Sequence, residues 1–287
     1  MKSRKIHTIG AYVLFLLITV SVWYVVFAHE ASGELTVTFL DVGQGDAVFI
    51  ETPSGVQVLI DGGLDATVLT ELAAMMPFWD RSIDIVIATH PDADHIAGLV
   101  PVAERYRVAQ FVESGVYADT ELTRALEEAL GKTTTPVHQA RRGDVFDLGD
   151  GVFATILFPD RDVSGLEANE ASIMLRLTFG EHAFMLTGDS SSAMERYLVS
   201  LDGAQLRSTV LKAGHHGSRT SSDVSFVGHV APEYVVFSRG CENQYGHPHE
   251  DVRELFVRFE VPIFDTCEHG AIQFISDGST LRIVTDS

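Results

Sequence analysis

The chain has 287 residues, of which 46% are hydrophobic and 24 are glycine. This composition excludes disordered and disulfide-dense proteins and fits one large globular domain. The formal net charge of −20 argues against tight, non-specific binding of a polyanion, because an acidic surface repels phosphates. The two cysteines, Cys241 and Cys267, form no Cys-x-x-Cys pair, so no thiolate zinc site is expected. One disulfide, if the domain lies outside the cytosol, and two free thiols remain alternatives.

The first 29 residues are expected to form a segment of their own. It begins with three basic residues, Lys2, Arg4 and Lys5. Residues 9–28 are apolar and uncharged, and the run has about the length that crosses a bilayer as a helix. The basic flank favours a cytoplasmic N-terminus, so residues 30–287 are expected to be extracytoplasmic. We expect a retained membrane anchor. A cleaved signal peptide is the alternative, because residues 26–28 resemble a cleavage site.

The pattern becomes β from residue 34. Leu35, Val37 and Phe39 alternate with polar residues, which predicts a half-buried strand. Residues 47–51 and 56–60 are expected to be two strands joined by a Pro- and Gly-containing turn. Further along we expect a helix at 66–76, a buried strand at 83–88, a helix at 96–106, a strand at 110–113 and a helix at 120–130.

The second half repeats this theme. We expect strands at 152–158, 172–179 and 182–186, a helix at 191–200, strands near Val210, Val235 and Ile272, and a helix at 250–259. Two expected hairpins, 49–61 and 173–189, each end in an Asp beside a Gly, at Asp61 and Asp189. Two β-rich halves with helices outside predict an α+β fold, a four-layer αβ/βα sandwich with these carboxylates in a cleft between the halves.

One loop carries the strongest functional signal. His90, Asp92, Asp94 and His95 are four potential metal ligands within six residues, directly after a buried strand, and Pro91 stiffens the loop. Alternation of ligand and spacer residues directs the first three side chains toward one region. A polar loop in which Asp94 caps the next helix is the competing interpretation, but it explains only one of the four residues. The pattern therefore predicts a metal site.

His-x-Asp-x-Asp-His resembles the metallo-β-lactamase-fold signature, whose usual form has His in place of Asp92. Further matching motifs are residues 39–46 (FLDVGQGD), 59–63 (LIDGG), 169–172 (NEAS), 186–189 (LTGD), 211–218 (LKAGHHGS), 245–248 (YGHP) and 269–272 (HGAI). In this order they resemble the C-terminal hydrolase domain of ComEC-type competence proteins and their stand-alone relatives.

The resemblance implies two metal sites: His90 and Asp92 form the first, Asp94, His95 and His215 form the second, and Asp189 bridges them. Many members of the fold complete the first site with a further histidine, where this chain has Asn169. Oxygen-rich ligation shifts the preference from zinc toward manganese or magnesium. One or two divalent ions are expected, manganese or zinc, with magnesium as a further choice.

The expected catalytic residues are Asp94, Lys212, His216 and His247. Lys212 is expected to neutralise a phosphoryl oxygen. His216 is assigned to transition-state stabilisation or leaving-group protonation, with an exchange of roles between His215 and His216 left open. Expected supporting residues, second-shell or substrate-contacting, are Asp41, Asp46, Asp61, Asn169 and Ser172. Asp61 is expected to orient a ligand histidine.

The leading functional hypothesis is a phosphodiesterase that acts as a nuclease on extracytoplasmic DNA, in which a metal-activated water attacks the phosphorus. The expected partners are DNA or another phosphodiester, the membrane through the N-terminal helix, and a DNA-uptake channel protein. One alternative is a cell-envelope phosphodiesterase for a small or lipid-linked substrate, which the acidic charge favours. The other is a non-hydrolytic module of an uptake machine. The oligomeric state does not follow from the sequence.

Overall fold

The computed structural model describes residues 10–21, 23 and 33–286. The chain divides into two compact units, Met1–Gly33 and Glu34–Ser287. In the first unit, residues 10–21 and 23 are helical. The expected anchor at 1–29 lies largely outside the described residues. Among those described, no helix has both the length and the apolar character needed to cross a membrane.

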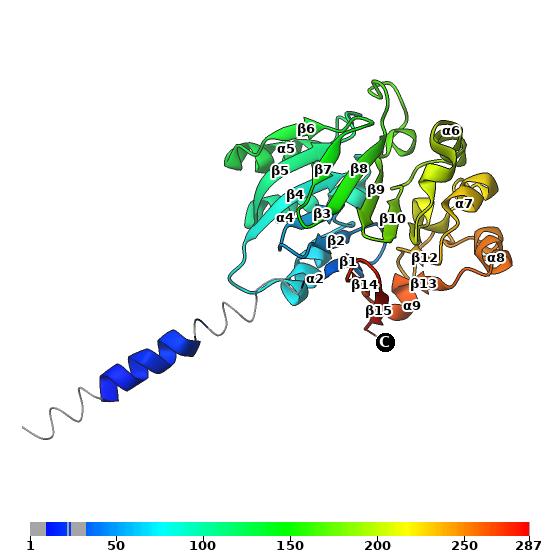
Figure 1. Cartoon of the computed structure of the whole chain (residues 1–287). Helices are drawn as coiled ribbons and strands as arrows, with labels where there is room; N and C mark the ends of the chain where they lie inside the picture. Colours follow the sequence, from blue (N-terminus) through cyan, green and yellow to red (C-terminus); the bar gives the residue numbers. More distant parts are fainter. Residues whose placement is uncertain (1–9, 22, 24–32, 287) are drawn as a thin grey trace, which may run out of the picture. The chain divides into compact units, whose positions relative to one another are not determined.

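The second unit contains two sheets (Figure 1). The first sheet has the strand order β15-β14-β1-β2-β3-β4-β5-β6. Its strands are β1 (Leu35–Phe39), β2 (Val48–Glu51), β3 (Gln57–Ile60), β4 (Ser82–Ala88), β5 (Arg107–Glu113), β6 (Val137–Gln139), β14 (Ile272–Ser276) and β15 (Leu281–Thr285). Strands β3 to β6 pair in parallel, whereas the other neighbours pair antiparallel.

The second sheet has the order β13-β12-β11-β10-β9-β8-β7. Its strands are β7 (Val145–Asp147), β8 (Val152–Phe158), β9 (Met174–Phe179), β10 (His182–Leu186), β11 (Val210–Lys212), β12 (Tyr234–Phe237) and β13 (Ile263–Asp265). Strands β10 to β13 pair in parallel. Each sheet therefore has a run of parallel strands whose carboxyl ends present loops at one edge.

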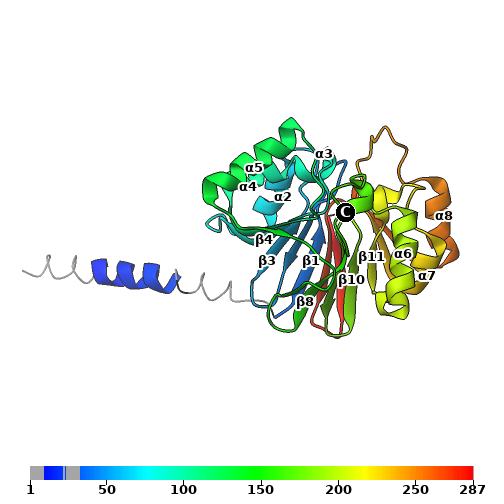
Figure 2. The same cartoon turned by 90° about the horizontal axis from the view of Figure 1, so that it is seen from above.

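Helices cover the outer faces of both sheets (Figure 2). The first sheet carries α2 (Thr67–Met75), α3 (Ala93–Ile96), α4 (Leu99–Arg105) and α5 (Glu121–Thr133), and the second carries α6 (Ser192–Asp202), α7 (Val224–Val230) and α8 (Glu250–Arg258). The short α9 (Thr266–His269) follows β13. One apolar cluster fills the space between the sheets, and two others lie beneath the helices. The expected α+β sandwich is thereby confirmed.

The helix expected at 96–106 begins later, because α3 ends at Ile96 and α4 starts at Leu99, directly after Gly98. A Cβ on Gly98 would lie 1.9 Å from the carbonyl oxygen of Gly62, and the amide of Gly62 donates to the carbonyl of His95 at 2.7 Å. This close backbone approach requires glycine and fixes the turn after β3 against the loop that carries the predicted ligands. The hairpins expected at 49–61 and 173–189 are β2–β3 and β9–β10, so Asp61 and Asp189 lie just beyond β3 and β10.

Candidate metal centre

The loop after β4 places His90 and His95 through one continuous set of hydrogen bonds. His95 Nδ1 lies 2.8 Å from Asp61 Oδ2, and the same carboxylate accepts from the amide and the hydroxyl of Thr89 at 2.8 and 2.7 Å. Because the Thr89 hydroxyl donates to Asp61, its oxygen accepts from His90 Nδ1 at 3.0 Å. The rings of His90 and His95 therefore each hold a proton at Nδ1, and the lone pair of Nε2 points away from Thr89 and Asp61.

His216 is held in the same way from the second sheet. The loop after β11 passes through the left-handed region at both His215 (φ 48°) and His216 (φ 53°), which turns the two rings in different directions. His216 is buried, and its Nδ1 donates to the carbonyl of Ser238 at 2.9 Å. Its Nε2 lies 3.3 Å from Asp94 Oδ2. The ring of His215 is 27% exposed, and its Nδ1 contacts Thr220 Oγ1 at 3.2 Å.

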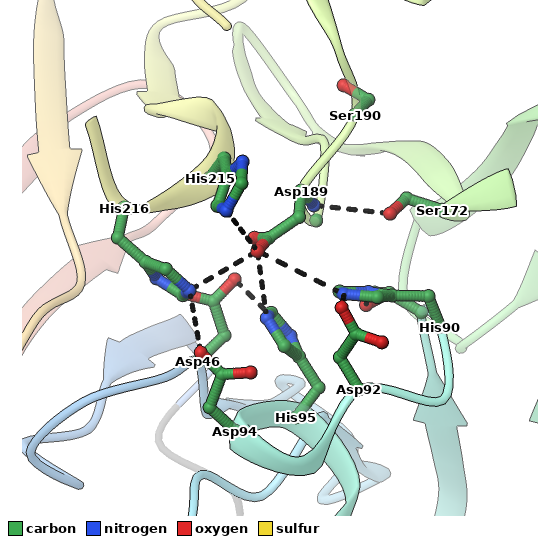
Figure 3. Close-up of polar contacts among 12 residues, drawn as sticks. Asp46, His90, Asp92, Asp94, His95, Ser172, Asp189, Ser190, His215 and His216 are labelled. Carbon is green, nitrogen blue, oxygen red and sulfur yellow. Dashed lines mark hydrogen bonds and ion pairs between the residues drawn. The ribbon is translucent and has the colours of Figure 1, made fainter. Parts of the chain in front are cut away.

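Four imidazoles converge on one oxygen of Asp189 (Figure 3). The Nε2 atoms lie 3.3 Å (His95), 3.3 Å (His216), 3.6 Å (His215) and 4.0 Å (His90) from Asp189 Oδ2. Asp189 itself is buried, and its amide donates to Ser172 Oγ at 3.3 Å. A buried carboxylate oxygen at the meeting point of four ring nitrogens is a candidate metal ligand.

The donor set fits divalent metal ions. Within the described residues, the Nε2 atoms of His90, His95 and His216 and the Oδ1 atom of Asp189 are buried and have no hydrogen-bond partner. Leaving such atoms unpaired is costly, and a cation would satisfy them together. Groups with ligand atoms within 4.8 Å of one another include His90–His95–Asp189 and Asp94–His95–His216.

Charges within the cluster shift the pKa values of its members strongly. Burial alone would lower the pKa of His95 and of His216. For His95 the nearby Asp189 and Asp61 outweigh burial, and for His216 Asp189 and Asp46 do, so that both pKa values lie well above the usual one. Burial would raise the pKa of Asp189, but His216 and His95 hold it well below its usual value. Protons and cations compete for the same Nε2 atoms, so metal affinity should fall as pH falls.

Lys212 has a different position from the one expected. Its side chain is 2% exposed, and Nζ lies 2.5 Å from Asp46 Oδ2 and donates to the carbonyl of Gly188 at 3.0 Å. Asp189 Oδ1 is 3.8 Å away. The expected contact with a phosphoryl oxygen stays a prediction, and the buried position of Nζ does not favour it. Lys212 instead balances the negative charge of Asp46 and Asp189 beneath the cluster.

The remaining expected residues lie at different distances from the cluster. Asp92 is 47% exposed, with Oδ2 3.6 Å from His90 Nε2, and Asp46 Oδ1 lies 3.3 Å from His216 Nδ1. Asp41 accepts from the amide of Gly43 at 3.3 Å within its own turn. Asn169 belongs to the 3₁₀ turn η1 (Asn169–Ala171), and its buried Oδ1 has no hydrogen-bond partner among the described residues.

His247 borders the cluster. Its ring centroid is 5.5 Å from that of His215 and 6.3 Å from that of His216. Burial and the neighbouring imidazoles lower the pKa of His247 to about 4, which favours the neutral ring at pH 7. Tyr245, which stacks on His247, and Gln44 also line this cleft of about 200 Å³. Sequence reasoning missed both as site residues, although each lies inside a motif that it had found.

The loop of His247 is tied to the body of the domain. Cys241 and Cys267 form a disulfide, which selects the first of the two alternatives for the cysteines. The side-chain amide of Asn243 donates to the carbonyls of Gly240 and His247, both at 2.8 Å. These contacts fix residues 240–247 next to α9 and keep His247 at the edge of the cleft.

Glu195 of α6 is a further buried acid that sequence reasoning missed. It accepts from the amides of Ser222 (3.0 Å) and Asp223 (2.6 Å), and so fixes the segment that follows the His215–His216 turn. Burial raises the pKa of its carboxyl to about 7. No sequence signal marks it, because a lone Glu in an amphipathic helix is usually exposed.

This pKa predicts a pH dependence of stability. Between about pH 4.5 and 7 the unfolded state loses the Glu195 proton while the folded state keeps it, so the free energy of unfolding should fall as pH rises through this window, by at most about 3 kcal/mol. Urea denaturation in EDTA from pH 4.5 to 7.5 measures the slope. Glu195→Gln should flatten it, and an unchanged slope in this variant would assign the dependence to other groups.

Comparison with known proteins gives matches over most of the domain. A family model described as "Metallo-beta-lactamase superfamily" matches residues 40–238. ComE operon protein 3 of Bacillus subtilis (strain 168) is 27% identical over 272 residues, 88% of this chain and 35% of the relative. Competence protein ComA of Neisseria gonorrhoeae is 32% identical over 254 residues, 88% of this chain and 34% of the relative. The chain thus spans about a third of the length of these two relatives.

A shorter relative is exodeoxyribonuclease WalJ of Streptococcus pneumoniae (strain ATCC BAA-255 / R6). It is 24% identical over 202 residues, which cover 66% of this chain and 69% of the relative.

Proposed function

The chain belongs to the metallo-β-lactamase superfamily and is a metal-dependent hydrolase of that class, and on this basis we propose that it is a phosphodiesterase that acts as a nuclease on DNA. The convergence of four imidazole Nε2 atoms on the buried Oδ2 of Asp189 carries the proposal (Figure 3). When bound, divalent ions lower the pKa of water and neutralise the charge that develops on a phosphodiester, which is the chemistry needed here.

The chain's own residues would hold two ions on either side of Asp189. Asp94, His95 and His216 would hold one of them, since their ligand atoms form a compact group. His90 and Asp92 would hold the other. The geometry favours His216 over His215 as a ligand of the first ion. This is the exchange of roles between the two histidines that the sequence left open. His215 faces Asp189 from outside that group, as a further ligand.

The two histidines should differ when each is replaced. His216→Ala should remove one bound manganese ion per chain and lower kcat by about 10²- to 10³-fold, because a buried ligand with a fixed proton is lost. His215→Ala should retain that ion and weaken the binding of the other. Isothermal titration with Mn²⁺ measures both stoichiometries. Loss of the tighter ion in His215→Ala, but not in His216→Ala, would reverse the assignment.

The names of the relatives support DNA as the substrate. Two matches are called competence protein ComA and exodeoxyribonuclease WalJ. The net charge of −20 opposes DNA binding by the surface at large. Cations bound at the cleft would offset this repulsion locally. Activity on DNA should therefore require a divalent ion for binding as well as for the reaction.

We also propose that the hydrolase domain is extracytoplasmic, tethered through residues 1–29, and acts beside a DNA-uptake channel protein. The basic residues before the apolar run support this orientation. The Cys241–Cys267 disulfide supports it independently, since disulfides persist mainly outside the cytosol.

The test uses the full-length protein stripped with EDTA and reloaded with Mn²⁺, Zn²⁺ or Mg²⁺. It should hydrolyse bis-p-nitrophenyl phosphate and DNA with at least one of these ions. Cleavage of bis-p-nitrophenyl phosphate without cleavage of single- or double-stranded DNA would favour the cell-envelope phosphodiesterase, which the acidic charge supports. No turnover of any substrate with any of the ions would favour the non-hydrolytic module.

A further inference from the structure

A second cavity borders the ligand loop next to the metal cleft. It has a volume of about 330 Å³ and is enclosed by the loop after β4, by β5 with the segment that follows it, and by α5. We call it the α5 pocket, and its walls include Pro91, Phe111, Glu113, Tyr117, Leu126 and Glu127. His90 lines it as well, so the α5 pocket and the metal centre share this one residue as a wall.

The chemistry of the α5 pocket differs from that of the metal cleft. Phe111 and Leu126 supply buried apolar surface, and Tyr117 presents an aromatic ring that is 59% exposed. Its charged groups are two carboxylates, half-buried Glu113 and exposed Glu127, and no described residue that lines it is lysine or arginine. This environment repels a phosphate. It suits a flat apolar ring with N–H groups at its edge, because carboxylates accept such hydrogen bonds and aromatic side chains stack on the face.

We propose that the α5 pocket binds the base of a nucleotide whose phosphate lies at the metal centre. This inference rests on the proposed nuclease function. His90 directs Nε2 toward Asp189 while Pro91, the next residue, forms part of the pocket wall. The phosphate and the base of one nucleotide would therefore both lie beside this short loop.

The two carboxylates favour a base over an acyl chain as the occupant. An acyl chain would cover Glu113 and Glu127 without offering a hydrogen-bond donor, which is unfavourable for a charged group. Exocyclic amino groups of adenine, cytosine and guanine offer that donor. The raised pKa of Glu113, caused by burial and by the nearby Glu127, shows that this wall is already poorly solvated.

A base in this pocket cannot remain paired in a duplex. The proposal therefore makes unpaired DNA the preferred substrate, since a duplex must first be opened at the cleaved nucleotide. A small diester such as bis-p-nitrophenyl phosphate has no base and should depend on the metal centre alone.

The test compares two substrates in full-length variants. Ala118→Trp places a large ring at the pocket wall, and Ala73→Trp on the exposed face of α2 is the matched control. We expect Ala118→Trp to raise KM for a single-stranded oligonucleotide at least about tenfold. Turnover of bis-p-nitrophenyl phosphate should stay within about twofold of wild type, and Ala73→Trp should alter neither. Wild type should prefer the single strand over a blunt duplex of the same sequence.

Tyr117→Ala provides a second variant, because an exposed loop side chain can be removed without disturbing the core. It should raise KM for the oligonucleotide several-fold and leave bis-p-nitrophenyl phosphate unaffected. If Ala118→Trp loses activity on both substrates, the kinetics of Tyr117→Ala decide whether the pocket binds the base. Unchanged oligonucleotide kinetics in an active Tyr117→Ala would overturn the pocket assignment, whereas a wild type that cleaves no diester would overturn the proposed function instead.

Discussion

Asp189→Ala should lower kcat for bis-p-nitrophenyl phosphate by more than about 10³-fold and abolish high-affinity binding of both metal ions. Its Oδ2 is the one atom toward which the Nε2 atoms of His90, His95, His215 and His216 all point. Without it, each ion would lose a charged ligand, and the four rings would no longer have a shared partner. Steady-state kinetics and isothermal titration with Mn²⁺ give the two quantities.

Asp119→Ala is the matched control for this variant. Asp119 is an exposed aspartate that pairs with Arg124 on the surface and lines neither cavity, so its loss should change neither hydrolysis of bis-p-nitrophenyl phosphate nor metal binding. Circular dichroism would verify that Asp189→Ala is folded. A folded Asp189→Ala protein that retains wild-type kcat or binds two ions would refute the shared-ligand role.

Lys212→Met should lower the free energy of unfolding by about 3–5 kcal/mol, measured by urea denaturation in EDTA at pH 7. Burial alone would lower the pKa of Lys212, but Asp46 and Asp189 outweigh it and raise the pKa, so the ammonium is charged in the folded protein. Removing it leaves Asp46 and Asp189 with the neighbouring imidazoles as the partners of their charge and removes the ammonium that contacts both carboxylates. The penalty follows from this lost charge compensation, since methionine has a similar volume.

The double variant Asp46→Asn with Lys212→Met separates this explanation from a packing defect. Removing one of the uncompensated charges should restore part of the lost stability. A Lys212→Met protein with wild-type stability and a raised KM would instead return Lys212 to the substrate-contacting role that the sequence suggested.

The part of the site that follows a regular strand could be predicted from sequence. Residues 88–95 continue from a buried strand. Asp61 and Asp189 each end a hairpin beside a glycine. The position of these two carboxylates at one edge of the sheets therefore follows from the alternation of the strands and from turn chemistry. The same alternation predicted both hairpins and the two-sheet sandwich.

Residues whose role depends on backbone conformation or burial could not be assigned in this way. His215 and His216 are adjacent, and only the left-handed backbone at both shows which ring turns inward. Lys212 ends a buried three-residue strand, where no periodicity marks it as an internal cation. Strands β6, β7 and β13 have three residues each, too few for alternation to be recognised, and they were missed.

Titration of Mn²⁺ into the EDTA-stripped full-length protein, with hydrolysis of bis-p-nitrophenyl phosphate followed at each step, tests the central claim most directly. We predict two bound ions per chain and no activity before the first addition, with activity rising as the sites fill. Hydrolysis that proceeds at full rate in EDTA, or a protein that binds no ion at all, would contradict the assignment of His90, His95, Asp189 and His216 to a metal centre.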